Sequence, residues 1–134
     1  MTPIKIYIDP NYPPSVVKIL QDIHALHKEK IVIILTWNEG NISEEDRVNG
    51  VFMVMDFQKR GFSIPILKQA QDGYKTIVCK GGEKMERFEL MMTILGVWPK
   101  ILKEIDDTNE KILLSFKYGR RNLVHYDLQE LVSH

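Results

Sequence analysis

Cysteine is nearly absent from this sequence, and so is any surplus of charge of one sign. Cys79 is the single cysteine among 134 residues, which excludes an internal disulfide and any zinc site built from several cysteines. The 18 Lys and Arg residues are balanced by 18 Asp and Glu residues. Bulk attraction to nucleic acid or to a membrane surface is therefore excluded, and such a partner would have to meet a local patch.

Long apolar runs are also missing. The run IVIILTW is far shorter than the roughly 20 residues that a membrane-spanning helix needs. The opening residues MTPIKIYID lack the basic region and apolar stretch of a secretory signal. We therefore expect a cytoplasmic protein without a membrane partner. The composition, 44% hydrophobic and 27% charged, is typical of a globular protein, and the length predicts a single domain over residues 1–134.

Short β-branched runs alternate with segments of helical period along the chain. This alternation predicts an α/β fold, a three-layer α/β/α sandwich with a mainly parallel sheet of about five strands. The predicted strands are residues 4–8, 31–36, 51–56, 75–79 and 111–118, with a short sixth strand at 122–126.

The helical segments carry recognisable start and stop signals. Ser15 follows two prolines and is predicted to cap the first helix. Ser63, with Pro65 in the first turn, is predicted to begin another. The longest pattern begins at residue 81 and is expected to bend or restart near Pro99, because proline removes a helical hydrogen bond.

Two of the predicted strands deliver an aspartate to their carboxyl ends. Asp9 follows the strand at residues 4–8, and Asp56 closes the strand at residues 51–56. Ligands of such sheets bind outside the carboxyl ends of the strands, so both carboxylates are expected at one cleft. Carboxylates that share a pocket repel each other unless a cation compensates, and Mg²⁺ or Mn²⁺ prefers oxygen ligands. The sequence therefore predicts a divalent-metal site with Asp9 and Asp56 as ligands.

An acidic segment, WNEGNISEED, offers further carboxylates for this site. It is predicted to be a loop with a helical turn begun by Ser43. Within it, Glu45 and Asp46 are the candidates for a catalytic role, and Glu39 and Glu44 lie nearby in the sequence. The competing interpretation is a solvated acidic loop, just as an aspartate at a strand end is often only a turn former.

A basic pair follows the second aspartate. Lys59 and Arg60 are suited to hold a phosphate beside the metal. A metal held in this way can activate a bound water and stabilise charge on a phosphodiester under in-line attack.

The opening DPNYPPSVVKIL, with its Asp-x-Asn-x-Pro-Pro pattern before an apolar helix, resembles the start of small PIN-like domains, the nuclease fold of VapC-type toxins. The resemblance continues through VFMVMDFQKRGFSIPILKQAQDGYKTIVCK and covers about residues 4–106. It implies a metal-dependent ribonuclease that hydrolyses RNA, with Asp9 and Asp56 as metal ligands and Asn11 shaping the substrate pocket. It also implies an antitoxin protein as partner, and a homodimer, because PIN-like proteins commonly dimerise.

Three positions depart from the family pattern. Val54 stands where the family usually has Thr or Ser, the acids of EED lie unusually close to Asp56, and Lys68 occupies the helix on which a further acid is expected. These departures support an alternative, a catalytically inactive PIN-like module that binds protein or RNA. Response-regulator receivers form a third alternative, because they share the predicted topology and place a lysine where this chain has Lys117.

Two further signals remain open at this level. The segment FKYGRRNLVHY combines basic and aromatic residues as RNA-binding surfaces do, and it could equally be a hairpin turn or an interface. His24 and His27 lie one turn apart but have no third metal ligand nearby, which favours a surface or half-buried pair.

Overall fold

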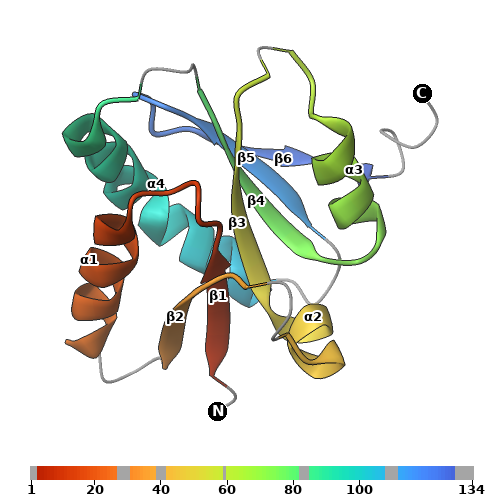
Figure 1. Cartoon of the computed structure of the whole chain (residues 1–134), viewed down its shortest axis with the longest axis horizontal. Coiled ribbons are helices and arrows are strands. Elements are labelled where there is room, and N and C mark those ends of the chain that lie inside the picture. Colours follow the sequence, from red (N-terminus) through yellow and green to blue (C-terminus); the bar gives the residue numbers. More distant parts are fainter. Residues whose placement is uncertain are drawn as a thin grey trace.

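A mixed six-stranded sheet forms the centre of the molecule (Figure 1). The computed structural model describes residues 3–26, 31–38, 42–58, 60–81, 85–107 and 112–128. In spatial order β2-β1-β3-β4-β5-β6, the first five strands are parallel and β6 runs antiparallel to β5. The strands are β1 (Ile4–Ile8), β2 (Val32–Thr36), β3 (Val51–Asp56), β4 (Lys75–Lys80), β5 (Leu113–Lys117) and β6 (Leu123–Tyr126). The mainly parallel sheet predicted from the sequence is confirmed, with six strands rather than about five.

The order of the parallel strands fixes where ligands are expected. The order 2-1-3-4-5 is that of flavodoxin-like doubly wound sheets, in which the chain reverses its direction of winding between β1 and β3. The crevice outside the carboxyl ends of these two strands is the usual ligand site of such sheets. Asp9 and Asp56 follow or close these same strands.

Helices lie on both sides of the sheet (Figure 1). They are α1 (Pro14–Ala25), α2 (Glu44–Asn49), α3 (Ile64–Gln71) and α4 (Arg87–Asp107). Successive side chains of β3 point to opposite faces of the sheet. Met53 packs in the larger core with α1 and α4, while Val54 packs in the smaller core with α3. This arrangement is compatible with the predicted three-layer sandwich. Within the described residues, none of the helices is long and apolar enough to cross a membrane.

Ser63 is at the cap position of α3 as predicted, and the predictions for Ser43 and Ser15 have opposite outcomes. Ser43 caps α2 as predicted, because its Oγ accepts the Asp46 N–H at 3.1 Å. The predicted cap Ser15 is wrong: α1 already begins at Pro14, with Pro13 at the cap position. Proline at the start of a helix has a suitable fixed φ and no N–H to leave unpaired, so the cap lies two residues closer to the N-terminus than predicted.

The longest helix also differs from the prediction. It begins at Arg87, where the Glu86 carboxylate accepts the N–H groups of Phe88 at 3.0 Å and Glu89 at 2.8 Å. These two hydrogen bonds lower the pKa of Glu86. The helix then runs without a restart through Pro99 to Asp107.

One face of α4 packs in the larger core, while other large apolar side chains of the helix are exposed. Phe88 is 71% exposed and Met92 46% exposed, whereas Leu90, Ile94 and Trp98 enter the larger core. Trp98 donates its indole N–H to Nε2 of the buried His24 at 2.8 Å, which ties α4 to α1. His24 is thus a core residue, and His27 lies outside the described residues.

Candidate functional site

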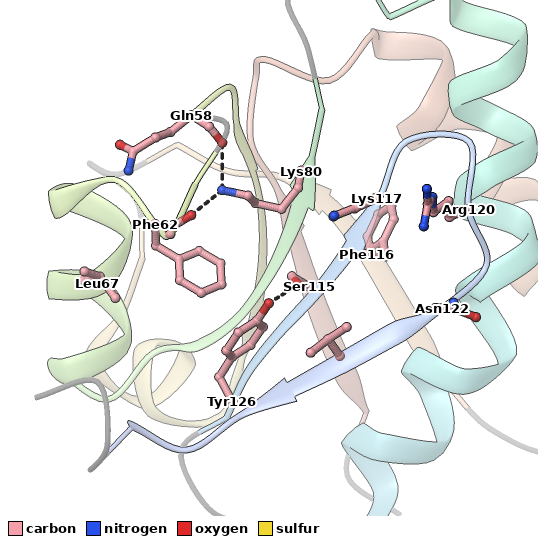
Figure 2. A pocket seen from close by; sticks show the side chains of 12 residues that line it. Gln58, Phe62, Leu67, Lys80, Ser115, Phe116, Lys117, Arg120, Asn122 and Tyr126 are labelled. Atoms are coloured by element: carbon pink, nitrogen blue, oxygen red, sulfur yellow. Dashed lines mark hydrogen bonds between the residues drawn. The ribbon is translucent and has the colours of Figure 1, made fainter.

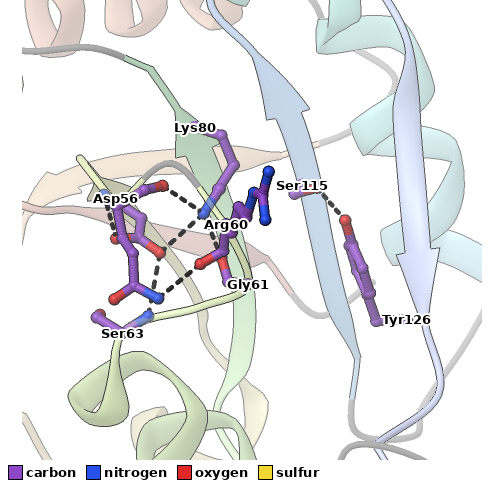
Figure 3. A network of polar contacts seen from close by, with 8 residues as sticks. Asp56, Arg60, Gly61, Ser63, Lys80, Ser115 and Tyr126 are labelled. Carbon is purple, nitrogen blue, oxygen red and sulfur yellow. Dashed lines mark hydrogen bonds and ion pairs between the residues drawn. The ribbon is translucent and has the colours of Figure 1, made fainter.

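Asp56 ends β3 with its side chain almost fully covered, at 4% exposure. Its Oδ1 accepts the Gln58 N–H at 3.0 Å, and its Oδ2 accepts the Ser63 N–H at 3.2 Å. The Lys80 ammonium, at the end of the neighbouring strand β4, lies 3.2 Å from the same Oδ2 (Figure 3). The buried carboxylate is therefore compensated from within the protein, and it fixes the loop between β3 and α3.

Lys80 completes the closure of this loop. Its ammonium also donates to the carbonyl oxygens of Gln58, at 2.8 Å, and of Gly61. With Asp56, these acceptors use all three ammonium hydrogens. Gly61 has φ +62°, a conformation that favours glycine, and Lys80 also lies 5.2 Å from the centre of the Phe62 ring. Lys80 therefore holds the β3–α3 loop in place through these contacts.

Asp9 lies at the same edge of the sheet but has a different partner. Its N–H donates to the Met53 carbonyl at 2.9 Å, which continues the pairing of β1 with β3. Its Oδ1 accepts the Asn11 N–H at 2.9 Å, an Asx turn that begins the proline-bounded loop. The structure thus brings Asp9 and Asp56 to neighbouring strand ends, each with its own hydrogen bonds, and leaves Asn11 exposed beside Asp9.

The other predicted acids lie elsewhere. Asp46, on α2, accepts hydrogen bonds from the Lys5 ammonium at 3.1 Å and from the Tyr7 hydroxyl at 3.0 Å. The hydrogen bond from Lys5 is the main cause that lowers the pKa of Asp46. Glu45 is exposed on the same helix, which lies toward the amino ends of the strands (Figure 1). The structure therefore separates Glu45 and Asp46 from the edge that carries Asp9 and Asp56.

Among the described residues, no group of three or more His, Cys, Asp or Glu side chains is arranged to hold a metal ion. The pair Asp9 and Asp56 would need further ligands, such as water, and a cation at Asp56 would compete with Lys80 for Oδ2. Of the predicted phosphate-binding pair, Arg60 is exposed, and Lys59 lies outside the described residues, as does Glu39.

A cavity of about 680 Å³ opens beside this region, between the β3–α3 loop and the strands β4, β5 and β6 (Figure 2). We call it the basic cavity, because three cationic side chains and no acidic one are among its described lining residues. These residues are Gln58, Gly61, Phe62, Leu67, Lys80, Ser115, Phe116, Lys117, Arg120, Asn122, Val124 and Tyr126.

The basic cavity has two chemically different ends. Lys117 and Arg120 lie toward the turn between β5 and β6, on either side of the Phe116 ring in this view, whereas Phe62, Leu67 and Tyr126 lie toward α3 (Figure 2). Both cationic residues are exposed. The cavity therefore presents positive charge at one end and apolar surface at the other.

Adjacent arginines in the basic segment separate in the fold. Arg120 lines the basic cavity, whereas Arg121 lies across α4 beside Gly96. A Cβ atom at Gly96 would stand 3.0 Å from Cγ of Arg121, so glycine at this helical position allows the close approach. The Arg121 carbonyl in turn accepts the Lys100 ammonium at 2.8 Å. Only one of the two arginines is thus available to a ligand in the cavity.

Sequence reasoning singled out residues 116–126 but missed the opposite wall of the cavity. Lys80 lies one residue beyond the predicted strand 75–79, and Phe62 precedes the predicted cap Ser63 without any motif of its own. One signal could have pointed to Lys80: it is a basic residue that directly follows a buried strand, next to the strand that ends in Asp56.

Comparisons of the chain with protein-family models, with curated proteins and with solved structures find no match. The class that the fold defines is an α/β protein with a mainly parallel, doubly wound sheet and polar groups at the carboxyl edge.

Proposed function

We propose that this protein is a ligand-binding module that holds an anion in the basic cavity. The observation that carries the proposal is that exposed Lys117 and Arg120 both line a cavity whose described lining contains no carboxylate. Arginine presents a planar fork of N–H donors that matches phosphate oxygens, and lysine adds a point charge. Their joint position at the end of a parallel strand agrees with where ligands of such sheets bind.

Lys80 has a different part in this proposal. Its three ammonium hydrogens already face Asp56 and two backbone carbonyls, so its charge is compensated. An anion is therefore held mainly by Lys117 and Arg120, and the amide of Asn122 lies on the same side of the cavity (Figure 2). Lys80 shapes the opposite wall by holding the β3–α3 loop.

The direct test is calorimetric titration with pyrophosphate at low salt, because screening weakens exposed charges. We expect saturable binding by the wild type and at least tenfold weaker binding by the double variant Lys117→Met with Arg120→Met. The matched control is Lys103→Met with Arg87→Met, which removes the same two charges from exposed positions of α4. Equal loss in the two double variants would reduce the effect to net charge and overturn the proposal.

A second candidate function is the metal-dependent ribonuclease implied by the PIN-like resemblance, a dimeric toxin with an antitoxin partner. One observation favours it: Asp9 and Asp56 flank the β1/β3 switch point, the usual ligand site of a doubly wound sheet. Catalysis would require Mg²⁺ or Mn²⁺ to compete with Lys80 for Asp56. RNA cleavage that needs either metal and disappears in Asp9→Asn would establish this function; metal-independent or absent cleavage would remove it.

The alternative of a response-regulator receiver has less support. The strand order 2-1-3-4-5 is shared with receivers, and Lys117 ends β5. However, Asp56 is 4% exposed, and both of its oxygens already accept hydrogen bonds. A strand-end acid in this state would have to leave Lys80 and the loop before it could take part in chemistry.

A further inference from the structure

We infer that the ligand of the basic cavity is an organic phosphate with an apolar body, rather than inorganic phosphate alone. This inference rests on the proposed function and names the class of its ligand. The phosphate group binds at Lys117 and Arg120, and the apolar body lies against Phe62, Leu67 and Tyr126 at the other end.

The apolar end of the cavity offers surface that a bare anion would leave in contact with water. Val124, on the edge strand β6, is 46% exposed and lines the cavity together with the half-buried Leu67 and Tyr126. An apolar ligand group covering these side chains would remove both its own surface and theirs from water, which is favourable.

Contacts within the protein hold this end in shape. The Phe62 and Tyr126 rings meet edge to face, with centroids 4.8 Å apart. The Ser115 hydroxyl lies 3.1 Å from the Tyr126 hydroxyl, and Lys80 lies over the Phe62 ring. Because these side chains are already fixed, little ordering is required when a ligand enters.

The size of the cavity favours a small molecule. Its volume of about 680 Å³ falls within the roughly 300–1,000 Å³ that is usual for small-molecule sites. Such sites are mostly apolar, with a few polar groups that fix the orientation of the ligand. The separation of Lys117 and Arg120 from the apolar end fits this pattern and gives the ligand one orientation.

The experiment compares phenyl phosphate, inorganic phosphate and benzyl alcohol as calorimetric probes. We expect the wild type to bind phenyl phosphate about tenfold tighter than inorganic phosphate, because the ring becomes buried. Benzyl alcohol, which has the ring but no charge, is expected to bind at least tenfold more weakly than phenyl phosphate.

Two substitutions test the apolar end separately from the charges. Val124→Thr and Leu67→Asn are expected to weaken phenyl phosphate binding several-fold while leaving inorganic phosphate binding unchanged. The control Val48→Thr alters a side chain that is 61% exposed on α2, and it is expected to change neither. Circular dichroism and a melting curve establish that each variant is folded before it is titrated.

The outcomes separate this inference from the function on which it rests. If phenyl phosphate and inorganic phosphate bind equally and both need Lys117 and Arg120, the cavity binds anions but the inference on the apolar body is overturned. That inference is also overturned if neither apolar substitution changes the affinity for phenyl phosphate. If neither phosphate depends on Lys117 and Arg120, the proposed function fails as well.

Discussion

The charged residues in the two halves of the carboxyl edge of the sheet differ in the partners that the protein itself gives them. On the β1/β3 half, Asp9 accepts a backbone N–H, and Asp56 accepts two and pairs with Lys80. On the β4/β5/β6 half, Lys117 and Arg120 face a cavity whose described lining contains no acid. The buried Asp56 is compensated by a cation of the protein, whereas Lys117 and Arg120 face a cavity that is open to a ligand.

The difference follows from burial. A carboxylate that is 4% exposed is costly unless donors surround it, so Asp56 needs Lys80 and the loop N–H groups for folding itself. Lys117 and Arg120 are exposed, and water can solvate them until a ligand arrives. A charged residue at a strand end therefore indicates a ligand site only when the fold leaves its charge uncompensated.

The largest predicted effect comes from making the same substitution in each half. Lys80→Met leaves the buried Asp56 carboxylate without its cation and is expected to lower the free energy of unfolding by about 3 kcal/mol. Lys117→Met removes an exposed charge and is expected to stay within about 0.5 kcal/mol of the wild type. Urea unfolding monitored by circular dichroism measures both values, and similar losses in the two variants would show that the two halves do not differ.

A double-mutant cycle assigns the stability lost at Lys80 to its partner. If the ion pair is responsible, Asp56→Asn with Lys80→Met should lose less stability than the sum of the two single losses. Additive losses would mean that Lys80 acts on the loop without help from Asp56.

The core beneath the acidic half is expected to respond to alkaline pH. Burial raises the pKa of Cys79 to about 12 and is the main cause that raises the pKa of Tyr12, whose hydroxyl donates to the Val54 carbonyl. The unfolded thiol loses its proton near pH 9, while the folded thiol keeps it up to about pH 12. The unfolded state then binds fewer protons, so stability that is complete below pH 9 falls as the pH rises, by at most about 1.4 kcal/mol per unit for this thiol.

Cys79→Ala isolates this contribution. The variant keeps every other ionisable group of the wild type, so the difference between the two pH profiles reports the thiol. Unfolding free energies at pH 8, 9, 10 and 11 are expected to fall less steeply in the variant. Parallel profiles would show that the buried thiol does not contribute.

The smallest effect is expected at Asp9. Asparagine keeps the Oδ1 acceptor that receives the Asn11 N–H, and it forms Asx turns as readily as aspartate. Asp9→Asn should therefore change the free energy of unfolding by less than about 0.5 kcal/mol. A clear rise in melting temperature would instead reveal carboxylate repulsion at this edge, as the metal-site hypothesis expects.

Local patterns in the sequence predicted the elements well. The β-branched runs gave the strands, and Ser43 gave the start of α2, because both signals act within a few residues. The positions of Asp9 and Asp56 at the carboxyl ends of two predicted parallel strands also predicted that they would reach the same edge. These features depend on backbone propensity and hydrophobic period, which a single sequence displays directly.

The partners of the charged residues could not be predicted in the same way. Asp56 and Lys80 are 24 residues apart and meet only because β4 lies beside β3. Arg120 and Arg121 are neighbours in the chain, yet Arg121 packs against α4 at Gly96, where no side chain excludes it. Such outcomes depend on strand order and on packing between distant elements, which periodicity does not contain.

Thermal melts of the wild type in EDTA, in Mg²⁺, in Mn²⁺ and in pyrophosphate decide which half of the edge binds a ligand. A ligand that binds only the folded state raises its melting temperature. We predict a rise with pyrophosphate that the Lys117→Met, Arg120→Met double variant loses, and no rise with either metal relative to EDTA. A rise with Mg²⁺ or Mn²⁺ that disappears in Asp9→Asn and Asp56→Asn, with no response to pyrophosphate, would contradict the proposal and make the acidic half the functional site.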